Sequence, residues 1–308
     1  MALNLHHLRI FFHVAQERSF SKAAECMYIS QPAVSKAVRE LEVQLGLPLV
    51  ERGISGTRSA RGVSLTDDGN ALWAHAAAIF ELEKAALDDI HARLNHQSGR
   101  LLIGASSTVA GYWLPHHLAQ LQRAASDLDL RVMSGNTKVI CQALLDYDVD
   151  IAVVEGAVED ERLIVTPWQE EALQIVAHPV HVKALERQLS GTQQEGLTWI
   201  LREEGSGTRA ATVRKLHELG LKPTSSIEFG SNEGIARAVA AAMGVAILPS
   251  QVVRELMLVG DVVVFSRPHI DELKRTLSIV EVKGRPVTAM ARLFKNLLME
   301  VIRVRPDC

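Results

Sequence analysis

The stretch FSKAAECMYISQPAVSKAVRELEVQLG, residues 20–46, has the pattern of two short helices joined by a tight turn. Ser30 is a typical N-cap, and Pro32 falls in the first turn of the second helix, where a missing N–H costs little. From Val34 to Leu45, apolar residues recur at spacings of four, three and four, which is the period of one helix face. The stretch therefore predicts a helix-turn-helix.

The other face of the second predicted helix is polar. Gln31, Ser35 and Arg39 are spaced four residues apart, and Lys36 lies beside them. Gln can bind adenine edges, Ser can bind bases or phosphates, and Lys or Arg can bind guanine or phosphate. A helix face that is merely solvated has a similar composition. The tight turn before the helix favours DNA, because the second helix of a helix-turn-helix enters the major groove.

A β-hairpin is expected directly after these helices. Leu49 to Arg52 is a short β-like run, Val63 to Leu65 alternates as a return strand, and the loop between them carries Arg58. Arginines at such a tip can bind phosphate or the minor groove, although a solvated loop would also carry them. The predicted DNA contacts from helix and hairpin are Ser30, Gln31, Pro32, Ser35, Lys36, Arg39, Arg52 and Arg58.

Several short motifs occur in a fixed order across residues 20–69. They are Phe20-Ser21-x-Ala23-Ala24, Ile29-Ser30-Gln31-Pro32-Ala33-Val34-Ser35, Leu41-Glu42-x-x-Leu45-Gly46, Leu49-x-x-Arg52 and Leu65-Thr66-x-x-Gly69. This order resembles the LysR-type transcriptional regulators. One departure is the loop between Arg52 and Leu65, which is several residues longer than the family pattern. The expected base contacts are Gln31, Ser35 and Lys36, and the expected phosphate contacts are Ser30, Arg39 and Arg52.

A single long helix is predicted over residues 67–97. Two acidic residues fill its first turn, where the helix dipole favours anions, and apolar residues recur at spacings of three and four from Leu72 to Leu94. About 28 residues in a single helix span roughly 42 Å. Because its own domain is too small to cover it, it is expected to pair with its copy in another subunit. The resemblance implies the same role, a linker helix that dimerises the DNA-binding domain of residues 1–66.

Short β-type runs alternate with helical stretches over residues 98–308. Two such sets predict a two-lobed α/β domain with mostly parallel strands and a hinge between the lobes. The expected strands are 101–105, 130–133, 150–154, 173–177, 198–201, 226–229, 245–248 and 277–282. The expected helices are 113–125, 137–146, 209–219, 232–242, 250–259 and 287–303. The resemblance implies an effector domain built like a periplasmic binding protein, with lobe I at about 98–170 and 272–308 and lobe II at about 171–271.

Polar loops follow the predicted strands of both lobes. In such sheets ligands bind beyond the carboxyl ends of strands, where helices begin and offer free N–H groups. Ser106 to Thr108 follow the first strand, and the loop from Gly205 to Arg209 carries hydroxyls and a cation. Each loop alone could consist of ordinary helix caps and turns. Two such loops on opposed lobes predict an anion cradle.

The complete set of predicted effector contacts adds polar residues at equivalent strand ends. It comprises Ser106, Ser107, Thr108, Asn136, Glu155, Gly205, Ser206, Gly207, Thr208, Arg209 and Asn232. Asn136 and Asn232 can alternatively be plain caps, and Glu155 is unfavourable for an anion unless it pairs with Arg209 or holds a water molecule. The strings around these loops are similar to the LysR branch linked to sulfur metabolism and carbon fixation. That similarity implies a small oxyanion as the effector, such as a sulfur oxyanion or a sugar phosphate.

The composition limits the class of protein. Apolar residues make up 47% and charged residues 22%, with no apolar run long enough for a membrane span. Because the net charge is only -3, any DNA contact must be local. Residues 1–66 hold eight Lys or Arg against five Asp or Glu, whereas residues 67–96 hold two against six. The three distant cysteines, Cys26, Cys141 and Cys308, favour a reducing cytoplasm over a disulfide framework.

Two other functions fit parts of the sequence. An enzyme is disfavoured because Gly205-Ser206-Gly207 lacks nucleophile-elbow spacing, and no His-Glu-x-x-His or P-loop motif occurs. No catalytic residue, metal site or cofactor is therefore expected. A solute-binding protein without DNA function would explain residues 100–308 but not the N-terminal segments. The family resemblance instead implies a dimer of dimers on two DNA half-sites, with RNA polymerase as a further candidate partner.

Overall fold

The computed structural model describes residues 2–51, 63–94, 98–190, 197–221, 223–265 and 273–304. The chain divides into two compact units, Met1–Leu87 and Asp88–Cys308. Within the described residues, no helix has the length and apolar character that crossing a membrane requires.

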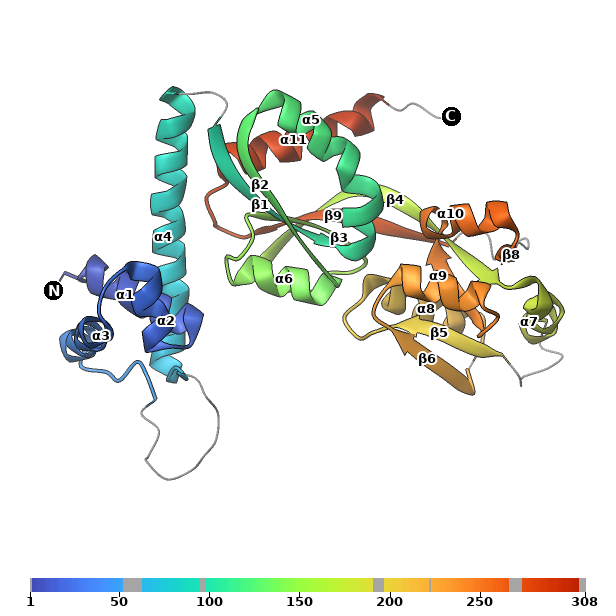
Figure 1. The fold of residues 1–308 in the computed structure, drawn as a ribbon, viewed down its shortest axis with the longest axis horizontal. Helices are drawn as coiled ribbons and strands as arrows, with labels where there is room; N and C mark the ends of the chain where they lie inside the picture. Colours follow the sequence, from blue (N-terminus) through green and yellow to red (C-terminus); the bar gives the residue numbers. More distant parts are fainter. Residues whose placement is uncertain are drawn as a thin grey trace. The chain divides into compact units, whose positions relative to one another are not determined.

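The first unit is a small helical bundle (Figure 1). Its first three helices are α1 (Leu5–Glu17), α2 (Phe20–Met27) and α3 (Gln31–Leu45). They pack around a core that includes Leu8, Phe11, Val14, Val34, Val38 and Leu41. Ser19 and Ser30 accept hydrogen bonds that cap α2 and α3, and Gly46 ends α3 in the left-handed conformation that suits glycine. The predicted helix-turn-helix is confirmed.

The predicted long helix is α4 (Asp67–Leu94), with 28 residues and two aspartates in its first turn. Near its start it packs on the bundle, where the Trp73 and Phe80 rings contact Phe12. Farther along it keeps large apolar residues exposed, among them Leu82 at 59% and Leu87 at 55%. The strands of the predicted hairpin meet in one antiparallel bridge, Val50 to Leu65. Arg52 and Arg58 lie outside the described residues.

Lobe I of the second unit is a sheet covered by helices on both faces. Its strands are β1 (Ser98–Ser106), β2 (Asp127–Gly135), β3 (Ile151–Glu155), β4 (Leu163–Ala177) and β9 (Lys274–Val282), in the order β2-β1-β3-β9-β4. Helices α5 (Leu114–Ala124) and α11 (Ala289–Val304) pack on one face, and α6 (Thr137–Leu145) packs on the other. A short π-helix, Val109–Trp113, joins β1 to α5.

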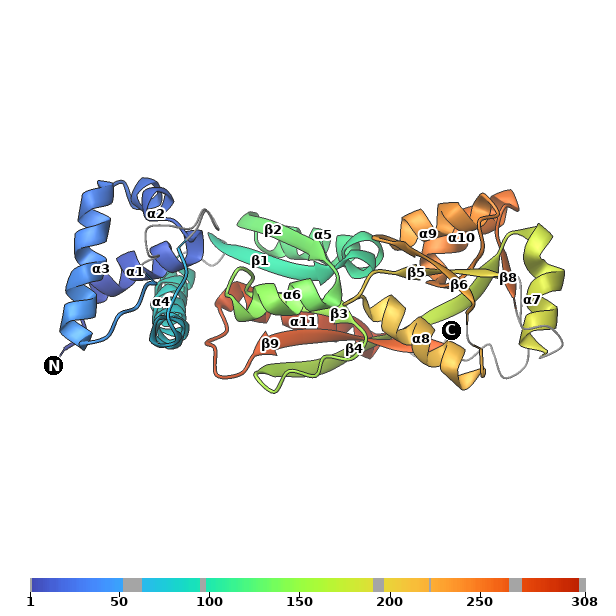
Figure 2. The same ribbon diagram turned by 90° about the horizontal axis from the view of Figure 1, so that it is seen from below.

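Lobe II repeats this layered arrangement. Its strands are β5 (Thr198–Arg202), β6 (Ser225–Phe229), β7 (Val245–Pro249) and β8 (Val263–Phe265). Helices α7 (Val182–Leu189) and α8 (Gly207–Glu218) cover one face, and α9 (Asn232–Ala240) and α10 (Ser250–Val259) cover the other. Figure 2 shows β4 running from one lobe into the other. Its first part pairs with β9 and its last part pairs with β7.

The expected strand 173–177 is only the end of β4, which begins ten residues earlier at Leu163. The early part was missed because it is a half-exposed strand, with Pro167 beside a register shift and no steady apolar alternation. The three-residue β8 and the helix α7 were also not predicted. The predicted two-lobed α/β architecture is otherwise confirmed, and α10 has the bounds expected from its apolar spacing. The expectation of mostly parallel strands is wrong, because every described pair that involves β4 or β9 is antiparallel.

Candidate functional site

The predicted DNA-binding residues of α3 lie on one exposed face. Gln31, Pro32, Lys36 and Arg39 are exposed and Ser35 is half-buried, opposite the buried side of the helix. Gln31 Nε2 donates to Ser35 Oγ at 3.0 Å, and Lys36 Nζ lies 3.8 Å from a Glu40 carboxylate oxygen. These contacts are weak and local, so the face is free to exchange them for contacts with bases or phosphates.

Tyr28 lies next to this face in sequence and was not among the predicted DNA-binding residues. Tyr28 is 96% exposed and occupies the left-handed region at the turn between α2 and α3, with φ 54°. It lies two residues before Ser30, whose Oγ accepts the Ala33 N–H at 3.4 Å. Its exposure depends on how the two helices pack, and nothing in a tyrosine's local sequence signals that.

Three residues of the predicted anion cradle come together between the lobes. Thr108 follows β1 in lobe I, Thr208 lies in the first turn of α8 in lobe II, and Asn232 begins α9. The Asn232 amide is 2.8 Å from Thr108 Oγ1 and 3.2 Å from Thr208 Oγ1. Each of the three residues is 1% exposed. The two loops that the sequence placed on opposed lobes thus meet in one buried cluster.

This cluster has more hydrogen-bond donors than it can use internally. Thr208 Oγ1 also accepts from Arg275 Nη1 at 2.7 Å. With the Asn232 amide donating to both threonines, its Oδ1 has no partner and the two hydroxyl protons have no acceptor among the described residues. Turning the amide over lets the hydroxyls donate to Oδ1 but leaves two N–H groups without acceptors. In either orientation, two donors remain for a ligand.

A buried ionic cluster lies directly beside these donors. The Arg275 guanidinium is 3.4 Å from a Glu155 oxygen and 2.5 Å from a Glu171 oxygen, and all three side chains are 3% exposed or less. Ser106 Oγ donates to the Glu155 carboxylate, and Trp113 Nε1 donates to Glu171 at 2.7 Å. Glu155 therefore pairs with Arg275 rather than with Arg209. Arg275 and Glu171 were not among the predicted residues, because only the pairing of β4 with β9 brings them together.

The remaining loop residues have structural contacts. Arg209 Nη1 donates to the Arg202 carbonyl at 2.6 Å and to Glu228 at 2.7 Å, both within lobe II. Ser206 caps α8, and Ser107 Oγ donates to the Gly135 carbonyl at 3.1 Å. A Cβ on Gly207 would collide with the Glu155 carbonyl, so Gly207 lets the lobes approach closely. Gly205 has φ 85°.

Asn136 connects the two lobes at a second place. Its Oδ1 caps α6, and its Nδ2 donates to Glu203 Oε1 at 3.2 Å and to the Glu204 carbonyl at 3.3 Å. Glu203 in turn accepts two hydrogen bonds from Arg202, at 2.7 and 2.8 Å. Burial works against ionisation of Glu203, but the hydrogen bonds and the charge of Arg202 hold its pKa below the ordinary value. Asn136 is thus both a cap and an interlobe contact.

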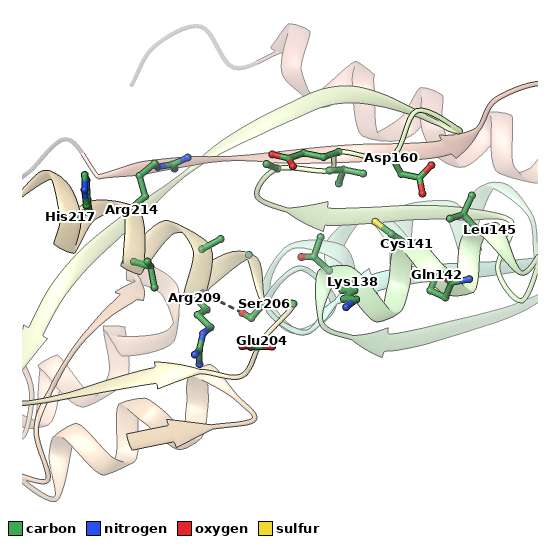
Figure 3. Close-up of a pocket in the computed structure, with 18 residues that line it drawn as sticks. Lys138, Cys141, Gln142, Leu145, Asp160, Glu204, Ser206, Arg209, Arg214 and His217 are labelled. Atoms are coloured by element: carbon green, nitrogen blue, oxygen red, sulfur yellow. Dashed lines mark hydrogen bonds between the residues drawn. The ribbon is translucent and has the colours of Figure 1, made fainter. Parts of the chain in front are cut away.

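A groove of about 940 Å³ lies between α6 and α8 (Figure 3). Lys138 and Cys141 line it from lobe I, and Arg214 and His217 line it from lobe II. Burial, with a smaller effect of Asp160, raises the pKa of the Cys141 thiol to about 11. The thiol is therefore protonated at neutral pH and is a poor nucleophile. No group of three or more metal-ligating side chains occurs among the described residues.

Comparisons with known proteins agree with this architecture. A family model described as a bacterial regulatory helix-turn-helix protein of the lysR family matches residues 5–70, and a LysR substrate binding domain matches residues 94–303. The chain is 33% identical to the HTH-type transcriptional regulator CysL of Bacillus subtilis, over 94% of this chain and 95% of that protein. It is 31% identical to the RuBisCO operon transcriptional regulator of Allochromatium vinosum, over 80% of each. A full-length OxyR variant from Pseudomonas aeruginosa has a TM-score of 0.71 and 26% identity, with 99% of this chain and 96% of that chain covered.

Proposed function

The chain belongs to the LysR family of transcriptional regulators, and from this premise we propose that α3 reads an operator while the interlobe cleft senses a small oxyanion. Gln31, Ser35 and Lys36 are the proposed base or positioning contacts. Ser30, Arg39 and Arg52 are the proposed phosphate contacts. The exposed polar face of α3, opposite its buried side, supports the assignments of Gln31, Ser35, Lys36 and Arg39.

The donor surplus at Thr108, Thr208 and Asn232 is the observation that carries the effector proposal. The oxygens of a small oxyanion are strong acceptors, so they satisfy the two donors that the cluster leaves over. Relatives such as CysL and the RuBisCO operon regulator fit the branch linked to sulfur metabolism and carbon fixation. That branch favours sulfur oxyanions or sugar phosphates as the candidates to test first.

Regulation follows from where the cluster lies. Because its members come from both lobes, a bound anion favours the closed arrangement, and the closed arrangement must favour one state of the assembled protein. We propose a dimer of dimers in which α4, with its exposed Leu82 and Leu87, pairs with a second copy. Acting on DNA, the protein works in the cytoplasm, with RNA polymerase as a further proposed partner. We assign it no enzymatic activity and no cofactor.

Thermal unfolding of the full chain tests the effector proposal directly. The panel comprises sulfite, sulfate, thiosulfate, phosphate and a sugar phosphate. An anion at 100 times its dissociation constant stabilises the folded state by about 2.7 kcal/mol, which is a shift of roughly 5–10 °C for a domain of this size. Thr208→Val should remove the shift. Thr198→Val, in β5 away from the cluster, should keep it. If none of the anions shifts the wild-type midpoint, the oxyanion proposal is wrong.

A further inference from the structure

The structure contains a buried guanidinium whose hydrogen bonds are incomplete. Arg202 ends β5, and its side chain is 1% exposed. Its Nε and Nη2 donate to the two carboxylate oxygens of Glu203, at 2.7 and 2.8 Å. Its Nη1 has no hydrogen-bond partner among the described residues. A buried charged donor without a hydrogen-bond partner costs free energy, so we expect Nη1 to bind an acceptor when one is present.

The side chain of Arg202 lies on the face of lobe II that α9 covers. Neighbouring residues of β5 alternate between faces: Trp199 packs in the cluster with α7 and α8, and Ile200 packs in the cluster with α9 and α10. Arg202 is two residues beyond Ile200 and shares its face. It pairs in register with Phe229, three residues before Asn232. The guanidinium and the Asn232 amide therefore occupy the same end of lobe II.

The guanidinium is held in a fixed orientation from both lobes. Glu203 Oε1 accepts from Arg202 and also from Asn136 of lobe I. A carboxylate bound on two sides keeps the planar fork in place, so little side-chain entropy is lost when Nη1 gains an acceptor. This arrangement leaves the Nη1 edge of the fork without an acceptor among the described residues.

Two other arginines of the second unit, Arg275 and Arg209, are already paired with carboxylates. Arg275 contacts both Glu155 and Glu171, so its charge is already balanced by two carboxylates. Arg209 is paired with Glu228. Among these three cations, Arg202 alone combines near-complete burial, a single carboxylate partner and an unpaired nitrogen.

We propose that Arg202 recognises the charge of the effector by donating from Nη1 to an oxygen of a small oxyanion. The proposal rests on the oxyanion function assigned above and names the cation of that site. The hydroxyl and amide donors around Asn232 bind other oxygens of the same anion. Arg209, the cation expected from the sequence, is then a structural residue of lobe II.

Anion titrations of the full chain test this assignment, with sulfate, sulfite, thiosulfate and inorganic phosphate as probes and calorimetry and thermal unfolding as readouts. For an anion that the wild type binds, Arg202→Met should weaken affinity roughly 10- to 100-fold, the value of one charge-assisted hydrogen bond. Arg202→Lys should recover part of the loss because it restores the charge. Arg209→Met is the matched control and should bind like the wild type. Binding to DNA without anion should persist in all variants.

The outcomes are separable. Wild-type affinity in Arg202→Met, or a loss confined to Arg209→Met, overturns the assignment to Arg202 while the oxyanion function stands. Absence of any anion binding by the wild type overturns the oxyanion function and this assignment with it. If Arg202→Met fails to fold, the comparison rests on Arg202→Lys and Glu203→Gln. The proposal requires both to bind the anion more weakly than Arg209→Met does, and equal binding by all three contradicts it.

Discussion

The polar residues of α3 and those of the interlobe cleft are held in opposite ways. On α3, Gln31 and Lys36 are exposed, and their contacts are to residues four positions away on the same helix. In the cleft, Thr108, Thr208 and Asn232 are 1% exposed and bond to one another across distant segments. The polar side chains on this face of α3 are not needed for the helix to fold, whereas the cleft residues are part of the interior of the fold.

This difference sets what substitution should do in each region. A side chain on α3 can be removed at little cost to folding, so its loss should appear almost entirely in DNA binding. A cleft side chain contributes to packing and to the ligand site at once, so its loss should change stability and binding together. Four substitutions with matched controls test the comparison.

The largest effect is expected at Arg275. Arg275→Met leaves Glu155 and Glu171 buried without their cation, which should destabilise the second unit by roughly 3–5 kcal/mol. The measurement is denaturant unfolding of the full chain. Its neighbour Lys274 also pairs with a glutamate of β4, Glu170 at 3.0 Å, but these two side chains are 61% and 66% exposed.

Lys274→Met is therefore the control and should cost less than about 1 kcal/mol. Both the Lys274–Glu170 pair and the Arg275–Glu171 pair join β9 to β4. The lysine pair faces solvent and the arginine pair faces the interior. Equal destabilisation by the two substitutions would contradict the claim that the buried ion pairs of Arg275 contribute more to stability than the exposed pair of Lys274 does.

A second effect is expected at the closest approach of the lobes. Gly207→Ala places a Cβ against the Glu155 carbonyl, so the lobes must separate or strain. Overpacking of this kind costs roughly 1–3 kcal/mol and should also weaken the response to an anion. Gly230→Ala is the control, because a Cβ there meets no atom within 4 Å. If thermal unfolding and anion response are the same for both variants, the lobes do not pack as closely as described.

The contrast between the two regions also explains what the sequence could predict of the fold. The helix-turn-helix, α4 and α10 follow from local apolar spacing and from caps such as Ser30, so they were predictable from short windows. The first part of β4 was not, because its stability comes from pairing with β9, more than a hundred residues away. This segment has no steady apolar alternation of its own, so no local pattern marks it as a strand.

The candidate site divides in the same way. Thr108, Thr208 and Asn232 could be named because polar residues after strands fall at one edge of an α/β sheet. The partners of Arg275 could not be named, because they depend on the register of two strands 104 residues apart. Nothing in the sequence around Arg202 indicates that its Nη1 lacks an acceptor. Whether a buried arginine is paired with a carboxylate depends on the tertiary fold, and the sequence shows only that arginines are present.

For the exposed face of α3, we expect a substitution to change DNA binding and not stability. Lys36→Ala should weaken binding to a genuine operator by roughly 1–3 kcal/mol and leave thermal stability unchanged. Lys183→Ala, which removes an exposed lysine from α7, is the control for lost charge. Binding is measured at several salt concentrations, because loss of a phosphate contact would lower the salt dependence by about one ion, whereas loss of a base contact would not. Equal affinity of the two variants would remove Lys36 from the interface.

The smallest expected effect separates folding from DNA contact at a single position. Ser30 caps α3 through a hydrogen bond of 3.4 Å to the Ala33 N–H, and Ser30→Ala should cost about 1 kcal/mol of stability. Ser30→Asp keeps a good cap, so its thermal midpoint should match the wild type. The added negative charge would face a phosphate, however, and operator binding should fall well below that of Ser30→Ala. If Ser30→Asp binds the operator as tightly as Ser30→Ala does, then Ser30 is a cap and no phosphate lies beside it. In that case the DNA-contacting surface of α3 would begin at Gln31 and would not include Ser30.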